Sequence, residues 1–371
     1  MQFNNIMWYI IIGDYMIQNA MECNFSSENI FSSKRDEKGN LLLDDLISSF
    51  TKKSRENAGT AERSKNWIKT TDGKYYLIKS DVEGIDNYSR YSELICMNLA
   101  KQVGLEYAKY DLVKLGGKDC IITEAMFKED ESLFSLDDLV EGSQLHPYEE
   151  GVFDYIYLYG QLEKKLESQD YKPGTKEKIF EELTKRNMFD YLIGEQDRHP
   201  KNISIIAPIN DVNNIRLSPI YDTEQALCLG ESLDNIDRFN KSEMAQASYM
   251  MSIYPRIAVV PNSKSNGEDM GFATLDMSIN EDGDLEEYFN DMCDKMDIEK
   301  AFESVEKQIN AKLPDEVKEV SRTALAINIE NAKRFLNYQI DIDYDDNYIR
   351  ETEKLISQRK EKNTRDDIET N

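Results

Sequence analysis

Histidine and tryptophan are the scarcest residues of this 371-residue sequence, with two of each. The two histidines, His146 and His199, cannot build a histidine-rich metal centre. Cysteine is also sparse. Its odd total of five and the lack of any Cys-x-x-Cys pair exclude a zinc cage and a disulfide framework. A reducing cytoplasm is therefore the expected location, and secretion as an effector stays open.

Positive charge is in short supply, because 45 Lys and Arg residues stand against 71 Asp and Glu residues, a net charge of −26. Such a surface repels phosphate backbones and anionic lipid headgroups. The balance argues against a nucleic-acid coat protein and against a polybasic membrane binder. A nucleotide site would need a local basic group or a metal ion to offset the field.

Long apolar segments are missing from the start of the sequence. The apolar run at 6–12 is far shorter than the ~20 residues that cross a bilayer. No basic region precedes it, so we expect a buried strand there rather than a cleaved signal peptide.

Core-forming residues are present in quantity. Hydrophobic residues make up 40% of the chain, with 21 Tyr and 14 Phe, which excludes disorder of the whole chain. The length exceeds the ~100–200 residues usual for one domain and fits two lobes.

Residues 1–126 predict a small α+β lobe. Asp72-Gly73 lies between β-prone runs, which is the strongest short signal for a hairpin. A helix with one apolar face is expected at 88–103, and Gly104 should end it. The remaining expected elements are a short helix at 41–50 and strands at 107–115 and 119–126.

Residues 127–371 predict a larger, mostly helical lobe, with the boundary near 126–130. Apolar residues recur at helical spacing in 148–166 and 175–194, and short strands are expected between 203 and 229. Two or three long helices are expected over 284–360, followed by a frayed, charged tail at 359–371. The polar, Met-rich segment 231–283 is expected to be irregular. It is interpreted as a substrate platform, a partner surface or a plain insertion, and the role of 1–56 stays open.

The segment 192–203 carries the most informative chemistry. It follows a predicted helix and precedes a predicted strand, and Asp197 and Asn202 have the Asp-x4-Asn spacing of kinase catalytic loops. In such loops the Asp accepts the proton of the substrate hydroxyl, and the Asn binds a magnesium ion on the nucleotide phosphates. Asp222 adds a carboxylate after a short apolar run. Asn202 and Asp222 would together give Mg²⁺ two of the oxygen ligands it needs.

Lys79 and Glu93 supply the second half of a kinase constellation. Lys79 closes a predicted strand, and Glu93 lies in the helix that follows. A helix carboxylate that holds this ammonium would direct it to the α- and β-phosphates of a nucleotide. Lys79 and the metal would then make the site locally cationic in spite of the net charge.

Each of these residues also has a purely structural interpretation. Asp197 and Asp222 could be turn residues, and Asn202 could satisfy the backbone of a loop. Lys79 and Glu93 could be solvated surface charges. His199 either holds the loop in place or lies near the phosphates. The order along the chain, from strand lysine to helix glutamate to Asp-x4-Asn loop to second Asp, favours the joint interpretation.

The two motifs that end at Asn202 and Asp222 also carry a family resemblance. Residues 192–202 read Leu-Ile-Gly-Glu-Gln-Asp-Arg-His-Pro-Lys-Asn and residues 217–222 read Leu-Ser-Pro-Ile-Tyr-Asp. They resemble the Leu-Ile-Gly-Asn-x-Asp-x-His-x-Lys-Asn and Pro-x-Tyr-Asp motifs of HipA-like serine/threonine kinases, over about 65–222. The resemblance implies a two-lobed, protein-kinase-like α+β fold that uses ATP and Mg²⁺, with Mn²⁺ as the alternative ion.

The resemblance also implies a role for each matching residue. Asp197 would be the catalytic base, Asn202 and Asp222 the metal ligands, and Lys79 a phosphate contact. Glu124 and Met126 match the hinge that holds adenine through backbone hydrogen bonds. The implied ATP-site residues are Ser64, Lys65, Lys79, Glu93, Glu124, Met126, His199, Lys201, Asn202, Tyr221 and Asp222. The sequence departs from the family at Glu195, where Asn is usual, and in the 59–65 loop, which holds a single glycine.

The function predicted is an ATP- and Mg-dependent kinase that phosphorylates Ser/Thr hydroxyls of a protein and also itself. The implied partners are a protein substrate and an antitoxin-like or regulatory protein, with no direct nucleic-acid or membrane binding. One alternative is a nucleotide-binding pseudokinase or interaction module. Another is a phosphoinositide-type lipid kinase. Residues 197–203 also resemble the catalytic loop of those enzymes, although the acidic surface argues against a lipid substrate. An acidic scaffold of unrelated helices is the remaining alternative.

Overall fold

The computed structural model describes residues 20–23, 25–43, 65–80, 87–140, 153–167, 171–211, 213–252, 256–258 and 285–338. The strand expected at 6–12, Ser64 and the tail at 359–371 lie outside these residues.

Contacts divide the chain into two compact units, each built from segments that are distant in sequence. Unit 1 comprises Met1–Leu133, Pro219–Ser242 and Lys295–Thr323. Unit 2 comprises Phe134–Ser218, Glu243–Asp294 and Ala324–Asn371. Unit 1 therefore holds both Lys79 and Asp222, whereas Asp197 and Asn202 belong to unit 2. The lobe ranges expected from sequence, 1–126 and 127–371, stay a prediction.

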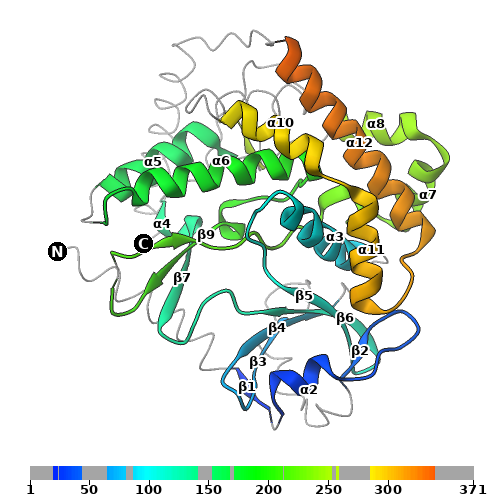
Figure 1. Cartoon of the computed structure of the whole chain (residues 1–371), viewed down its shortest axis with the longest axis horizontal. Helices are drawn as coiled ribbons and strands as arrows, with labels where there is room; N and C mark the ends of the chain where they lie inside the picture. Colours follow the sequence, from blue (N-terminus) through cyan, green and yellow to red (C-terminus); the bar gives the residue numbers. More distant parts are fainter. Residues whose placement is uncertain are drawn as a thin grey trace, which may run out of the picture. The chain divides into compact units, whose positions relative to one another are not determined.

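Unit 1 contains a six-stranded sheet of order β1-β3-β4-β6-β5-β2 (Figure 1). The Asp72-Gly73 hairpin is confirmed, because β3 and β4 pair antiparallel on either side of it. The helix expected at 41–50 is wrong at its start, where Leu41–Leu42 form β2 and pair parallel with β5; residues 44–50 lie outside the described part of the chain. The strands are β1 (Met21–Glu22), β2 (Leu41–Leu42), β3 (Lys65–Lys69), β4 (Tyr75–Ser80), β5 (Tyr110–Leu115) and β6 (Lys118–Glu124).

Two helices cover this sheet, α2 (Ser27–Phe31) on one face and α3 (Ser89–Gln102) on the other (Figure 1). Ile30 of α2 packs into a core cluster with Ile68, Ile78 and Ile122 of the strands. The helix expected at 88–103 is confirmed as α3, and Gly104 follows it at φ +76°, a conformation that favours glycine. The other helices that lie wholly in unit 1 among the described residues are α7 (Leu233–Lys241) and α11 (Ile298–Ile309), and α11 packs against α3.

Gly39 fits tightly against α11, and we expect Gly39→Ala to destabilise the protein by about 2–4 kcal/mol. Gly39 has φ +85°, and an added Cβ would lie 2.8 Å from both Cβ and the carbonyl oxygen of Ile309. Left-handed backbone costs a non-glycine residue roughly 1 kcal/mol, and overpacking adds about 1–3 kcal/mol. Gly73→Ala is the matched control, since Gly73 has φ +79° and no atom within 4 Å of the added Cβ. Urea unfolding of both variants checks the difference, and equal losses would contradict the packing argument.

Unit 2 is mainly helical. α5 (Tyr155–Glu167) and α6 (Thr175–Ile193) run side by side (Figure 1). The helix expected at 175–194 is confirmed, and the one expected at 148–166 is confirmed from Tyr155 onward; it is wrong at 153–154, which form a strand, and 148–152 lie outside the described residues. Their apolar faces share a core with Ile203 and Ile205. Gly194, at φ +62°, ends α6. The other helices with residues in unit 2 are α4 (Leu136–Leu139), α8 (Glu243–Ser252), α10 (Leu285–Lys295) and the last part of α12 (Asp315–Tyr338).

Short strands complete unit 2. β9 (Ser204–Pro208) pairs with β10 (Arg216–Leu217) in a three-stranded sheet of order β10-β9-β7, where β7 (Glu131–Ser135) enters the unit at Phe134. β8 (Phe153–Asp154) pairs parallel with β11 (Ile257–Ala258). The segment 231–283, expected to be irregular, is helical over α7 and α8 in its described part. Ser232 caps α7 and Glu243 begins α8, and polar residues at these starts give no apolar periodicity.

Asp154 gives unit 2 a titrating group, and we expect it to weaken the fold as the pH rises. Its carboxylate is buried and accepts the N–H of Tyr157 at 2.7 Å, at the start of α5. Burial raises the pKa of Asp154 to about 6. A raised folded-state pKa means that the folded chain binds the proton more tightly. The stabilisation is therefore complete below the unfolded pKa of ~3.9 and is lost as the pH rises through 6.

Asp154→Asn keeps the oxygen that accepts the Tyr157 N–H and removes the charge. The free energy of unfolding of this variant, measured relative to the wild type, should therefore increase by up to about 3 kcal/mol from pH 4 to pH 7. Chemical denaturation at several pH values measures this difference. A difference that does not change with pH would contradict the assignment.

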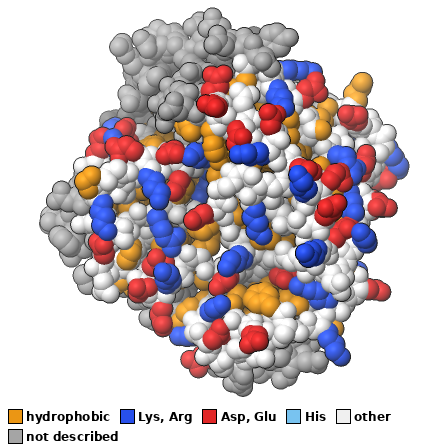
Figure 2. Space-filling model, viewed as in Figure 1, with side chains coloured by type: hydrophobic (Ala, Val, Ile, Leu, Met, Phe, Trp, Pro, Cys, Tyr) orange, Lys and Arg blue, Asp and Glu red, His pale blue; other side chains and the backbone are white. Residues whose placement is uncertain are grey.

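The surface of the described residues is mixed in sign. On the face in Figure 2, lysine and arginine side chains are interspersed with aspartate and glutamate. Within the described ranges, no helix combines the length and the apolar character that a membrane crossing requires.

Candidate functional site

Lys79 anchors the candidate site of unit 1. Its neighbour on β4, Ile78, packs into the sheet core, so Lys79 points to the opposite face of the sheet. There the side chain is only 5% exposed, and Nζ lies 2.6 Å from Oδ1 of Asp222 and 3.6 Å from Oε1 of Glu224. A lysine this buried needs such partners, because desolvation penalises an uncompensated charge.

Asp222 is held in a strained backbone conformation. The chain just before Asp222 is fixed by a β-bridge between Tyr107 and Ile220, in which the Ala108 N–H donates to the Ile220 carbonyl at 2.8 Å. Asp222 itself has φ +59°, and its N–H donates to the Tyr110 hydroxyl oxygen at 3.2 Å. Left-handed backbone at a non-glycine residue costs energy and is typical of functional sites. This geometry fixes the direction of the carboxylate.

Glu93 is completely buried on α3 and takes part in a hydrogen-bond network. Its Oε2 accepts from the Tyr107 hydroxyl at 2.8 Å and from the Thr223 hydroxyl at 3.1 Å. The preceding residue, Ser92, donates to the Thr223 carbonyl at 2.6 Å. Burial raises the pKa of Glu93, and the charge of Lys79 counteracts part of this shift. The carboxylates within 4 Å of Lys79 Nζ include those of Asp222 and Glu224, and the hold of Glu93 on this ammonium stays a prediction.

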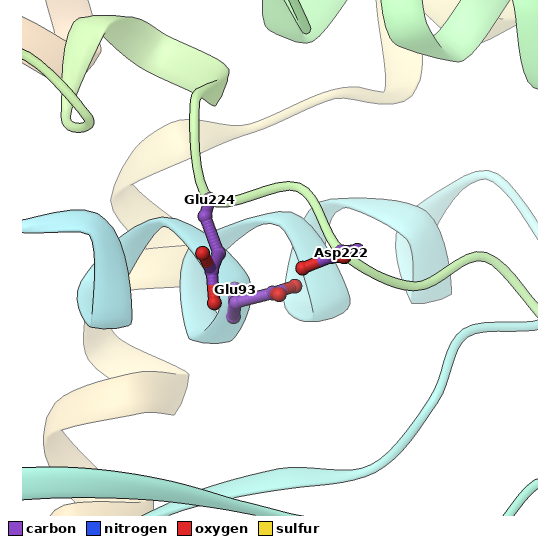
Figure 3. A group of neighbouring side chains, drawn as sticks. All are labelled: Glu93, Asp222 and Glu224. Atoms are coloured by element: carbon purple, nitrogen blue, oxygen red, sulfur yellow. The ribbon is translucent and has the colours of Figure 1, made fainter. Parts of the chain in front are cut away.

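Three carboxylates of unit 1 converge on one point. Figure 3 shows Glu93 from α3 near Asp222 and Glu224, which lie on a separate loop. One oxygen from each lies within 4.8 Å of the other two, close enough to share a metal ion. Oxygen donors suit Mg²⁺, and the buried Oε1 of Glu93 has no hydrogen-bond partner among the described residues. The residues present therefore fit a hard divalent cation. Sequence analysis overlooked Glu224, although it lies two residues after Asp222.

In unit 2, a buried ion pair fixes the loop that follows α6. Arg198 donates to both carboxylate oxygens of Asp190, at 2.8 and 2.9 Å, and both side chains are less than 10% exposed. A third bond of 3.2 Å runs from Arg198 to the Asn202 carbonyl. A bidentate, charge-assisted pair of this kind holds the loop against the end of the helix.

The backbone of Asp197 is held by its own loop. Its N–H donates to Glu195 at 2.6 Å, and its carbonyl accepts from the His199 N–H at 2.8 Å and from the Asn202 side chain at 3.2 Å. Glu195, the departure from the family motif, thus has a defined acceptor role. The Asp197 side chain is 41% exposed, with Oδ1 3.2 Å from Arg256 Nε and Oδ2 4.0 Å from His199 Nε2.

The remaining residues predicted for the site include two with contacts of their own, Glu124 and Lys201. Glu124 ends β6, and its carboxylate oxygens lie 3.8 Å from the ammonium groups of Lys74 and Lys109. The N–H of the next residue, which precedes Met126, donates to the Tyr75 carbonyl. Lys201 is exposed, 3.8 Å from Asp137. Unit 1 holds Lys65, Lys79, Glu93, Glu124, Met126, Tyr221 and Asp222, and unit 2 holds Asp197, His199, Lys201 and Asn202. Their roles stay predictions.

Comparisons with known proteins identify the family. The model of the HipA-like C-terminal domain matches residues 52–317, well over half of the chain. The chain therefore belongs to the HipA-like C-terminal domain family, and the resemblance seen in the two motifs is confirmed.

Solved structures show the fold. The Helicobacter pylori proinflammatory kinase CtkA is similar with a TM-score of 0.57 at 14% identity, over 76% of this chain and 95% of CtkA. HipA in the Shewanella oneidensis MR-1 complex with HipB and operator DNA has a TM-score of 0.46 at 13% identity, over 79% of this chain and 68% of HipA. No curated protein sequence matches the chain. The α+β, kinase-like fold expected from the sequence is confirmed.

Proposed function

We propose that the protein is an ATP- and Mg-dependent kinase that transfers the γ-phosphate to Ser/Thr hydroxyls of a protein and to itself. Membership of the HipA-like family and the fold shared with CtkA support kinase activity. The single observation that carries the proposal is the ion pair of the buried Lys79 with the part-buried Asp222, 2.6 Å apart. These two residues match the phosphate-binding lysine and the metal-binding aspartate of a kinase, and they are far apart in the sequence.

The carboxylates of unit 1 suit the metal-dependent part of this function. Asp222 would hold Mg²⁺, and the predicted second ligand is Asn202. When bound, the ion would neutralise charge on the phosphates. Lys79 is already close to Asp222 and would contribute its ammonium to the same phosphates. Ser64 and Lys65 are proposed to line the nucleotide phosphates, and Glu124 and Met126 to hold adenine.

Asp197 suits the role of catalytic base. Its backbone is fixed on three sides by the loop, whereas its carboxylate is accessible at 41% exposure. A base must come within hydrogen-bond reach of the hydroxyl that it deprotonates, so accessibility and a fixed position are both needed. His199 and Lys201 are proposed to contribute to phosphate binding from the same loop.

Partners and location remain proposals that rest on family membership and charge. An antitoxin-like or regulatory protein is proposed as a partner alongside the protein substrate. The net charge of −26 supports a protein rather than a nucleic acid or a membrane as the acceptor. A cytoplasmic location is proposed from the odd number and scattered positions of the five cysteines.

A transfer assay with γ-labelled ATP tests the proposal. The purified protein with Mg²⁺ should incorporate label into itself or into protein of a cell lysate, and EDTA should abolish incorporation. Phosphosite mapping should then find phosphoserine or phosphothreonine. If the protein binds ATP, seen as a rise in its melting temperature, and transfers no label, the pseudokinase alternative is correct. If ATP causes no rise and no label is transferred, the scaffold alternative is correct.

A further inference from the structure

A cation from outside the catalytic loop contacts the carboxylate of Asp197. Arg256 Nε lies 3.2 Å from Asp197 Oδ1, and both residues belong to unit 2. The loop fixes the backbone of Asp197 through Glu195, His199 and Asn202, while its contact to the carboxylate, His199 Nε2 to Oδ2 at 4.0 Å, is beyond hydrogen-bond distance. The direction of the carboxylate therefore depends on Arg256. This arginine lies in the 231–283 segment, outside both motifs that carry the family resemblance.

The position of Arg256 is set by the core of unit 2. The next residue, Ile257, is buried in the cluster formed by α5 and α6. Ile257–Ala258 form β11, which pairs parallel with β8, and the Phe153 N–H donates to the Arg256 carbonyl. Arg256 directly precedes β11, so the buried Ile257 and the bond from Phe153 hold its backbone, while its side chain is 46% exposed and lies against Asp197. Arg256 is thus presented to the catalytic loop by a fixed backbone.

We propose that Arg256 is a positioning residue for phosphoryl transfer, which holds Asp197 through Oδ1 and leaves Oδ2 to accept the proton of the substrate hydroxyl. This inference rests on the proposed kinase function. A carboxylate with a fixed backbone still rotates about its side-chain bonds, and one ion pair to a fixed guanidinium restricts that rotation. Misplacement of a catalytic group by about 1 Å lowers the rate of the chemical step by up to ~100-fold. Nucleotide binding does not depend on the Asp197 carboxylate and should be spared.

Arg256→Ala tests this role through the separation of kcat from KM. Initial rates of label transfer across a range of ATP concentrations should show kcat reduced at least about tenfold, with KM for ATP within about twofold of the wild type. Arg256→Lys should recover part of the loss, because it restores the charge without the planar guanidinium. Arg334→Ala is the matched control: Arg334 is an exposed arginine of unit 2, paired with Glu330 on its own helix, and its loss should leave kcat unchanged.

A double variant separates positioning from a general effect on the fold. In the Asp197→Asn background, Arg256→Ala should cause no further loss, since residues that act as a unit are not additive. Arg256 is 46% exposed, so the variant should keep the wild-type melting temperature; should it fail to fold, Arg256→Gln replaces it. An active wild type with an unchanged kcat in the variant would overturn this inference alone. An inert wild type would overturn the kinase proposal and this inference with it.

Discussion

Asp197→Ala is expected to lower the rate of phosphoryl transfer by about 10²–10⁴-fold and to leave nucleotide binding intact. Positioned general bases contribute factors of this size. The carboxylate is 41% exposed, and its contacts are to Arg256 and, at 4.0 Å, to His199, so its removal leaves the core untouched. The measurement is the rate of γ-label incorporation at saturating ATP, together with the ATP-dependent rise in melting temperature.

Asp197→Asn and Asp211→Ala complete this experiment. Asn is nearly isosteric with Asp and cannot accept the proton as a carboxylate does, so its loss of rate should approach that of Ala. Asp211 is an exposed aspartate of the same unit, paired with Lys172 at 3.3 Å, and its removal should not change the rate. Activity of Asp197→Asn close to that of the wild type would refute the assignment of Asp197 as the base.

Arg198→Ala is expected to lower the free energy of unfolding by about 3–5 kcal/mol. Arg198 and Asp190 form a buried, bidentate pair, and truncation of one partner leaves an uncompensated charge in the interior. The same substitution removes the bond to the Asn202 carbonyl. Urea unfolding at pH 7 measures the loss.

Burial is what gives the Arg198–Asp190 pair its large effect, and Arg322→Ala checks this. Arg322 also makes two carboxylate contacts, to Glu299 and Glu319, but it is exposed. Exposed pairs contribute about 0–1 kcal/mol because water and salt screen them. A loss for Arg198→Ala no larger than that for Arg322→Ala would show that the loop is held by other contacts.

Elements with strong local signals were predictable from the sequence. The Asp72-Gly73 turn defined the β3–β4 hairpin, and Gly104 marked the end of α3, where it adopts a positive φ. β2 was missed for the opposite reason. Its two residues are strand only because they pair with β5, far along the chain, so no local pattern distinguishes them from a helix.

The residues of the candidate site also fall into those with a local sequence signal and those without one. Asp197, Asn202 and Asp222 were predicted from motif spacing, and Lys79 from its place at the end of a strand. Glu224 and Arg256 were not found, because a carboxylate and an arginine in irregular sequence carry no signal until the chain folds. The buried network around Glu93 is likewise a product of tertiary structure, since Tyr107 and Thr223 meet it from distant segments.

That network couples a helix to a carboxylate. Ser92 and Glu93 of α3 are both hydrogen-bonded to Thr223, the residue directly after Asp222. A rotation or translation of α3 would therefore reorient the Asp222 carboxylate, and the buried bonds would transmit the change in either direction. Because α11 packs against α3, a substitution at that helix contact would disturb the Asp222 carboxylate from outside the space that a nucleotide would occupy.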